Sequence, residues 1–268
     1  MSLTRIRQLL QSHTGLDSAS TSTAVIRAAV VQRMSACRLR SEHEYAEYLQ
    51  QSPGELKQLI ALAVVPETWF FRDATQFAAL KQWGQSRRSS GTRYLNVLSA
   101  PCATGEEPYS IAITLLEAGF TPDQFRIDSL DVSHHALERA LRGLYDERSF
   151  REQQDPAVMS RYFQVRGNQR AVTPPVRASV YFQQGNLLDG NLRSAAQPYD
   201  VIFCRNLLCR LETSSKHRAY GILHRYLHDT GILFLGDSDC AAAPTELFGA
   251  AEHHHSSAMF KQPMEARE

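Results

Sequence analysis

Polar side chains follow short apolar stretches at several points in the chain, where they could bind a small ligand. The apolar stretch from Tyr94 to Ser99 precedes residues 100–108, in which Glu106 and Glu107 stand at the start of a helical pattern. This loop lacks a G-x-G-x-x-G fingerprint, and two acids at a helix N-terminus repel a pyrophosphate group. Glu107 has an alternative role, because with Thr104 it forms a capping-box pattern.

A second acidic residue ends the next apolar stretch. Residues 125–132 have the composition of a strand, and Asp131 stands at its end. An acid at this position can accept hydrogen bonds from both ribose hydroxyls of a nucleoside, although it can also cap the following helix. An acid here, without a phosphate cradle, predicts a nucleoside ligand that has no diphosphate, such as S-adenosylmethionine.

The elements that would position these residues alternate between strands and helices. We expect strands at 94–99, 125–132, 199–204 and 231–235, with helices between them, which is the pattern of a doubly wound parallel α/β sheet. Residues 163–185 interrupt the pattern and predict a small antiparallel insertion. Before residue 84 the chain has helical patterns with capping residues, and we expect Gly84 to end the last helix there. The predicted organisation is a helical domain at 1–84, a linker at 85–92 and an α/β domain at 93–268.

The composition narrows the class of protein. The chain has 268 residues, 43% of them hydrophobic, with 29 Lys+Arg against 28 Asp+Glu. A net charge of +1 argues against a protein that binds nucleic acid. Five widely spaced cysteines without a C-x-x-C pair predict reduced thiols in a cytoplasmic protein and no metal site. No run of 18 apolar residues occurs, so we expect no membrane insertion.

Four ordered motifs give the chain a family resemblance over nearly its whole length. They are residues 67–73 (ETWFFRD), 98–110 (LSAPCATGEEPYS), 186–188 (NLL) and 203–206 (FCRN). In these motifs the chain resembles the CheR-type chemotaxis receptor methyltransferases. The resemblance implies an all-α N-terminal domain, followed by a Rossmann-like class I methyltransferase domain with a small antiparallel β-subdomain insertion.

The resemblance also implies site residues and a reaction. Residues that match the family's S-adenosylmethionine contacts are Thr68, Arg72, Glu107, Asp131, Asn186, Leu187, Arg205 and Asn206. Arg72 can hold a carboxylate of cofactor or substrate, and its alternative is a surface charge. Asn186 can bond the adenine edge, and Asn206 can instead be a turn residue.

The implied reaction is methyl transfer to glutamate side chains on the cytoplasmic helices of a methyl-accepting chemotaxis-type receptor, leaving S-adenosylhomocysteine. A glutamate is already ionised at neutral pH, so alignment suffices and no general base is required.

The chain departs from the family pattern at two positions. Pro66 stands where many members have Asn, and Arg210 stands where many have a Tyr near the transferred methyl group. We expect Arg210 to alter the rate or to pair with the incoming carboxylate. The insertion is shorter than in members that bind a receptor's C-terminal pentapeptide, which predicts an enzyme independent of that peptide.

Three further features have competing interpretations. Arg27, Arg33, Arg38 and Arg40 form a basic, acid-free stretch, on which Arg33 and Arg40 would share a helix face that binds the acidic receptor helix or is simply solvated. His253–His255 suggest a solvated hairpin rather than a metal site. Cys102 is either a pocket residue or a small buried thiol.

Two alternatives to receptor methylation stay open. A methyltransferase for a different protein substrate would share the cofactor pocket without needing the basic face. A cofactor-binding adaptor would bind S-adenosylmethionine tightly and transfer nothing.

Overall fold

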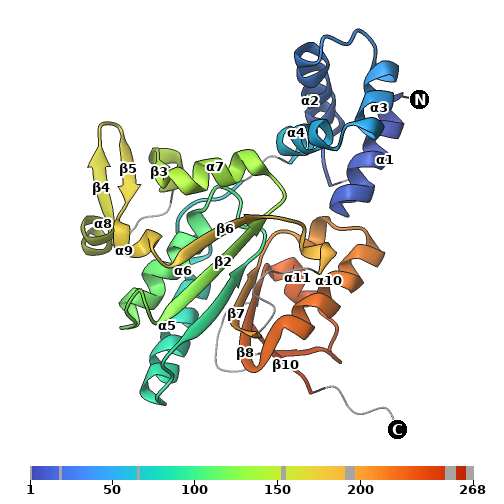
Figure 1. Ribbon diagram of the computed structural model, residues 1–268. Helices are drawn as coiled ribbons and strands as arrows, with labels where there is room; N and C mark the ends of the chain where they lie inside the picture. Colours follow the sequence, from blue (N-terminus) through green and yellow to red (C-terminus); the bar gives the residue numbers. More distant parts are fainter. Residues whose placement is uncertain are drawn as a thin grey trace.

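The computed structural model describes residues 2–17, 20–64, 67–151, 155–190, 197–250 and 258–263. An all-helical unit stands beside a larger α/β unit (Figure 1). The helical unit consists of α1 (Ser2–Thr14), α2 (Thr23–Ala36), α3 (Glu42–Gln51) and α4 (Pro53–Ala63). No helix in the described ranges is long and apolar enough to cross a membrane.

The helical unit has a hydrophobic core of its own. Ile6, Val30, Tyr45 and Leu59 are fully buried in it, one from each helix. Capping residues start these helices, as the sequence patterns before residue 84 predict: the hydroxyl of Ser41 accepts a hydrogen bond from the Glu44 amide, and α4 begins with a proline. These local signals were readable because capping depends on residues within one turn of the helix end.

A seven-stranded sheet forms the centre of the α/β unit, in the order β6-β2-β1-β7-β8-β10-β9. Its strands are β1 (Leu95–Ser99), β2 (Phe125–Asp131), β6 (Val180–Gln184), β7 (Tyr199–Cys204), β8 (Leu227–Leu235), β9 (Phe248–Ala250) and β10 (Ala258–Lys261). The predicted parallel arrangement is confirmed for β1, β2, β7 and β8, whereas β10 and β9 are antiparallel. The sheet is therefore mixed.

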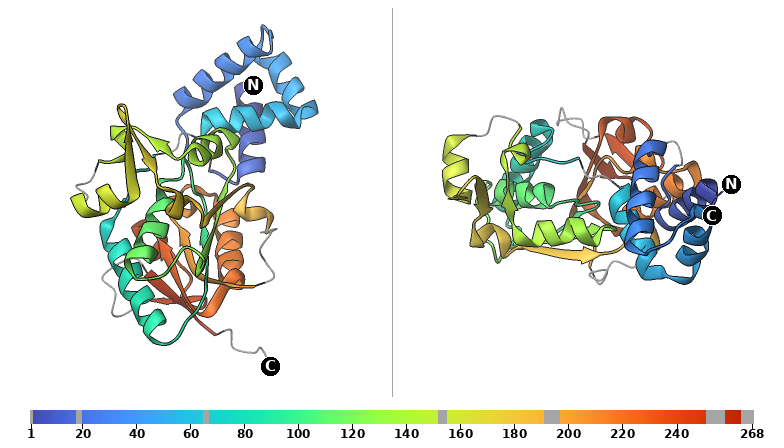
Figure 2. Two further views of the ribbon diagram at one scale, coloured as in Figure 1. Left: turned by 60° about the vertical axis from the view of Figure 1, so that its left-hand side comes forward. Right: turned by 90° about the horizontal axis from the view of Figure 1, so that it is seen from above.

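Alternating side chains of the central strands fill two cores, one on each face of the sheet. In β7, Val201 and Phe203 belong to one core, and Ile202 and Cys204 belong to the other. Helices α5 (Ala74–Ser89) and α6 (Glu106–Glu117) cover the first face, and α10 (Thr213–Tyr226) covers the second (Figures 1 and 2). Burial on both faces explains why these strands are continuously apolar in sequence.

The prediction that Gly84 ends a helix and that residues 85–92 form a linker is wrong. Helix α5 continues to Ser89, and Gly84 is buried within it. A Cβ at Gly84 would lie 3.3 Å from the Cβ of Ala118, so the glycine permits close packing beside α6. Helix α5 also contributes Leu80 and Trp83 to the core of the α/β unit, and not to the helical unit as predicted.

The predicted antiparallel insertion is present but has different limits. A three-stranded sheet in the order β3-β5-β4 forms from β3 (Leu144–Tyr145), β4 (Phe163–Arg166) and β5 (Gln169–Val172). Residues 180–184 were placed in this insertion, and that is wrong: as β6 they pair in parallel with β2 in the main sheet. Strand β6 lies at the edge of the main sheet and follows the β4–β5 hairpin in the chain, and nothing in its local sequence indicates which of the two sheets it joins.

Short helices complete the fold. They are α7 (His134–Arg142), α8 (Pro156–Tyr162), α9 (Pro174–Arg177), α11 (Asp237–Ala241) and the 3-10 turns η1 (Glu147–Ser149), η2 (Leu187–Asp189) and η3 (Leu208–Arg210). Helix α7 packs on β2 and β6 and also against α4, so it joins the helical unit to the α/β unit (Figure 1).

Candidate functional site

Two adjoining pockets lie where β1, β2 and β7 end. The first is lined by Thr68, Arg72, Glu107, Asp131, Arg205 and Asn206. The second is lined by Leu130, Asp131, Asn186 and Leu187, together with Thr14 and Leu16 of the helical unit. Asp131, Asn206 and Arg210 border both pockets. The structure thus gathers every cofactor-site residue predicted from the sequence around one divided cavity.

Asp131 stands at the junction of the two pockets and is fixed by backbone groups. The amides of Ala103 and Ser133 each donate a hydrogen bond to its carboxylate, at 2.8 Å. Burial raises the pKa of Asp131, and these amide donors oppose the rise. Its alternative role as helix cap is wrong, because the hydroxyl of Ser133 caps α7. The carboxylate is therefore held rigidly at the wall between the pockets.

Glu107 faces the first pocket from the start of α6. Ser99 donates a hydrogen bond of 2.8 Å to its carboxylate, and an Arg205 nitrogen lies 3.4 Å away. Burial raises the pKa of Glu107, while Arg205 opposes the rise. The capping-box alternative is wrong: Gly105 is at the N-cap, and Thr104 donates to Glu106 instead. Glu107 is thus left to face the pocket, where a cation would compensate its charge.

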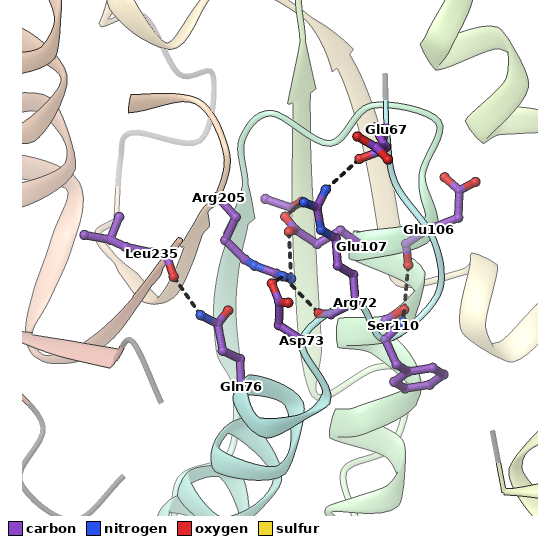
Figure 3. Close-up of polar contacts among 11 residues, drawn as sticks. Glu67, Arg72, Asp73, Gln76, Glu106, Glu107, Ser110, Arg205 and Leu235 are labelled. Carbon is purple, nitrogen blue, oxygen red and sulfur yellow. Dashed lines mark hydrogen bonds and ion pairs between the residues drawn. The ribbon is translucent and has the colours of Figure 1, made fainter. Parts of the chain in front are cut away.

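Arg205 forms part of the wall of the first pocket, with only 2% of its side chain exposed. Its guanidinium bridges the carboxylates of Glu107 and Asp73 and donates to the carbonyl of Arg72 at 2.9 Å (Figure 3). Among the described residues its Nε has no hydrogen-bond partner. These contacts join the end of β7 to the segment that precedes α5, so Arg205 positions the groups around it.

The segment before α5 is bent so that Arg72 reaches the first pocket. Phe71 and Asp73 both have positive φ angles, 56° and 58°, which are unfavourable for residues with a Cβ. Arg72 donates to the carbonyl of Glu67 at 2.8 Å (Figure 3). Its guanidinium also lies over the Trp69 ring, 4.5 Å from the ring centroid.

Asp73 is the site residue that the sequence reasoning missed. By residue type and position an acid before α5 is an N-cap candidate, and Asp73 does occupy the N-cap position, but its side chain makes no capping bond and pairs with Arg205 instead. The only sequence signal was an acid directly after Arg72, and nothing in the sequence indicates that its partner lies 132 residues away.

Asn186 and Leu187 form a wall of the second pocket. The Asn186 side chain accepts from the Leu188 amide at 3.0 Å and donates to the His13 carbonyl of α1 at 2.9 Å. Leu187 is buried. Asn206 has a φ of 58°, so its turn role is confirmed, and it lines both pockets as well.

The shared basic face predicted for Arg33 and Arg40 is wrong. Helix α2 ends at Ala36, so Arg40 lies beyond it, at an exposed position just before α3. Arg33 turns inward and donates two hydrogen bonds, of 2.8 and 2.7 Å, to the buried carboxylate of Glu55. The helical period of α2 could not predict this pairing, because Glu55 is on another helix, α4.

The remaining predicted features are placed as follows. Arg210 lines both pockets, and Cys102 is a buried thiol that also lines the first, so both of its interpretations hold. Pro66 and His253–His255 lie outside the described residues. Within the described ranges, no group of three His, Cys, Asp or Glu side chains could hold a metal ion.

Comparison with known proteins bears on this site. Residues 66–256 match the family model described as CheR methyltransferase, SAM binding domain, and residues 1–62 match CheR methyltransferase, all-alpha domain. The chain belongs to the CheR methyltransferase family. The resemblance predicted from the four motifs is confirmed, and so is the fold it implied: an all-α domain followed by a class I methyltransferase domain that binds S-adenosylmethionine.

Individual relatives of this CheR family member have different lengths. This chain is 42% identical over 239 residues to the probable biofilm formation methyltransferase WspC of Pseudomonas aeruginosa, and the match covers 88% of this chain and 56% of that protein. Chemotaxis protein methyltransferase 2 of Vibrio cholerae is 30% identical over 267 residues, covering 96% of this chain and 91% of that protein. The chain thus spans about half the length of the WspC relative and nearly all of the Vibrio relative.

Proposed function

We propose that this CheR family member transfers the methyl group of S-adenosylmethionine to glutamate side chains on the cytoplasmic helices of a methyl-accepting chemotaxis-type receptor. The observation that carries the proposal is the position of Asp131 at the junction of a charged and a largely apolar pocket. S-adenosylmethionine joins an amino acid to a nucleoside through the ribose. It therefore needs charged groups for the amino acid, an acceptor for the ribose hydroxyls and an apolar pocket for the adenine, in that order.

The residues fit the cofactor part by part. Arg72 and Glu107 present a cation and a carboxylate, which suit the carboxylate and ammonium of the methionine half. Asp131 retains acceptor capacity for the ribose hydroxyls, because each of its oxygens has more than one lone pair. Leu130 and Leu187 offer apolar walls to the adenine, with Asn186 at its edge. Thr68, Arg205 and Asn206 complete the proposed site.

The chemistry rests on alignment. When bound, S-adenosylmethionine supplies a methyl group whose bond to sulfur breaks as the glutamate oxygen bonds to the carbon, the electron pair passing to sulfur. The glutamate is ionised, so this chain need only hold the partners in line and exclude water. Arg210 borders both pockets, and we infer that it holds the incoming carboxylate.

The test measures transfer of labelled methyl to receptor cytoplasmic domains, with S-adenosylhomocysteine binding followed by calorimetry. Because the relatives' names cover biofilm formation and chemotaxis, receptors from both kinds of pathway serve as acceptors. Base-labile label on receptor glutamates that is lost in Arg72→Ala is the expected result. Binding without transfer to any receptor would favour the adaptor or a different protein substrate, and Arg210→Tyr would then show whether activity returns.

We also propose that receptor recognition is independent of a C-terminal pentapeptide. The inserted sheet has only a two-residue turn, Gly167–Asn168, between β4 and β5. A receptor domain with and without its last five residues should be methylated at equal rates, and a binding assay with the free peptide should give no signal. Saturable peptide binding would refute this part of the proposal alone.

A further inference from the structure

The end of α1 contacts both walls of the second pocket, although it belongs to the helical unit. We call residues 13–17 the α1 tail. Leu16 pairs with Leu211 in an antiparallel bridge, the Asp17 amide donates to the Arg210 carbonyl at 2.7 Å, and the Glu212 amide donates to the Gly15 carbonyl at 3.1 Å. The tail therefore forms a short ladder with the chain directly after η3.

The α1 tail also fixes the other wall. The carbonyl of His13 accepts from the Asn186 side chain, and Gly15 packs against Leu188 of the same turn. A Cβ at Gly15 would lie 2.3 Å from a Leu188 methyl carbon and 3.1 Å from the Ser215 hydroxyl. With a φ of +73°, this glycine has both the conformation and the lack of side chain that the close approach requires.

A polar side-chain contact attaches the same region from outside the pocket. Gln11, two residues before the tail, donates to the Glu212 carboxylate at 2.8 Å. Thr14 and Leu16 of the tail themselves line the pocket, between Asn186 and Arg210. Residues from two parts of the α/β unit are thus held at a fixed separation by a segment from the helical unit.

We propose that the α1 tail is a positioning element of the cofactor site, which holds the Arg210 loop and the Asn186 turn so that they enclose the nucleoside half of S-adenosylmethionine. This inference rests on the function proposed above. It makes the helical domain part of the cofactor site, so that a partner that moves α1 changes cofactor affinity.

The test weakens the attachment without touching the pocket lining. Gln11→Glu places a second carboxylate against Glu212, and calorimetry on the full chain measures the Kd for S-adenosylhomocysteine and for 5′-methylthioadenosine, which keeps the nucleoside half. We expect both Kd values to rise about fivefold in Gln11→Glu, because two carboxylates at this spacing repel each other and weaken the attachment. The double variant Gln11→Glu/Glu212→Gln restores an amide–carboxylate pair and should restore both Kd values.

Two controls separate positioning from general damage. Gln8→Glu makes the same charge change at an exposed position on the same helix and should bind as wild type. Gly15→Ala should weaken binding, whereas Gly167→Ala, at a similar φ of +63° with open space around it, should not. Thermal melts confirm that each variant is folded, and a mere loss of stability lowers the melting temperature without changing the Kd.

Separate outcomes overturn the inference and the proposed function. A folded Gln11→Glu with wild-type Kd values, or a loss that the double variant does not reverse, overturns the role of the α1 tail. If Asp131→Ala binds S-adenosylhomocysteine as tightly as wild type, the proposed cofactor site itself is wrong.

Discussion

Two clusters in this protein each pair an arginine with a buried glutamate, one in the helical unit and one at the pocket, and they differ in how fully the glutamate is compensated. In the helical unit, Arg33 and the hydroxyl of Tyr45 together donate three hydrogen bonds, all of 2.7 to 2.8 Å, to Glu55. Burial raises the pKa of Glu55, but these donors outweigh it and the net pKa is lowered. Every charge in this cluster is compensated by the protein, so the cluster holds three helices together and leaves nothing for a ligand.

The cluster at the pocket is compensated only in part. Arg205 is shared between Glu107 and Asp73, its nitrogen is 3.4 Å from Glu107, and the pKa of Glu107 remains raised. Burial of a carboxylate without full compensation is unfavourable, and an ammonium group entering the pocket would remove that cost. We infer that the incomplete ion-pair cluster, which faces a cavity, takes part in ligand binding, whereas the complete cluster supports the fold.

Removing Arg205 should have the largest effect. Arg205→Ala leaves Glu107 and Asp73 without their cation, and loss of one partner of a buried pair costs about 3 kcal/mol or more. We expect that loss of stability in a urea titration, together with about a hundredfold weaker S-adenosylhomocysteine binding. Arg205→Lys, which keeps the charge but not the fork, should be intermediate. Wild-type affinity in Arg205→Ala would show that the two clusters do not differ in function.

Removing Arg33 should affect stability alone. Arg33→Ala leaves the Glu55 carboxylate buried, and because the arginine is 22% exposed we expect a smaller loss, about 2 kcal/mol. The Kd for S-adenosylhomocysteine should not change. Arg27→Ala, at an exposed position on the same helix, is the control and should change stability by less than about 0.5 kcal/mol. A change of Kd in Arg33→Ala would link this cluster to the site.

Glu55 and Glu107 should contribute to the stability of the fold with opposite dependences on pH. Glu55, with a lowered pKa, adds stability that is lost as the pH falls, whereas the raised pKa of Glu107 makes its contribution to stability fall as the pH rises. Ligand binding should follow the ionised form of Glu107, so affinity for S-adenosylhomocysteine should decline on acidification while the pH is still above 4.5, the ordinary value for glutamate.

Calorimetry from about pH 8 to about pH 5 measures this decline. Glu107→Gln should bind weakly throughout and retain only the part of the pH dependence that comes from Asp131, whose pKa is also raised. A profile in Glu107→Gln as steep as in wild type would exclude Glu107 as the group that holds the ammonium.

The smallest effect is expected at Asp73. Its side chain is 52% exposed, and exposed ion pairs contribute up to about 1 kcal/mol, so Asp73→Asn should weaken cofactor binding by no more than about fivefold. Added salt should narrow the difference between variant and wild type. Asp123→Asn, at an exposed position, provides the matched control. A loss as large as that of Arg205→Ala would mean that Asp73 contacts the ligand directly.

Local patterns predicted most of the elements correctly. A helix was expected after the strand at 125–132, and the helix of residues 134–142 starts after Ser133 and stops at Gly143, two signals that act within one turn. The strand at 199–204 was readable from its apolar run between polar residues. Gly84 was misread because the same residue type serves a helix end and a close helix contact, and only the position of α6 distinguishes the two.

In the candidate site too, some features could be predicted from the sequence and others depend on the tertiary structure. The sequence by itself determined that Asp131 and Glu107 follow two strands of one sheet, and the carboxyl ends of parallel strands meet at a single edge, so their convergence was predictable. Only the tertiary structure decided that Arg33 pairs with Glu55, that Asp73 pairs with Arg205, and that the end of α1 forms part of the pocket. These contacts join elements that are distant in the chain, and side-chain periodicity gives the direction in which a residue points but not the partner it meets.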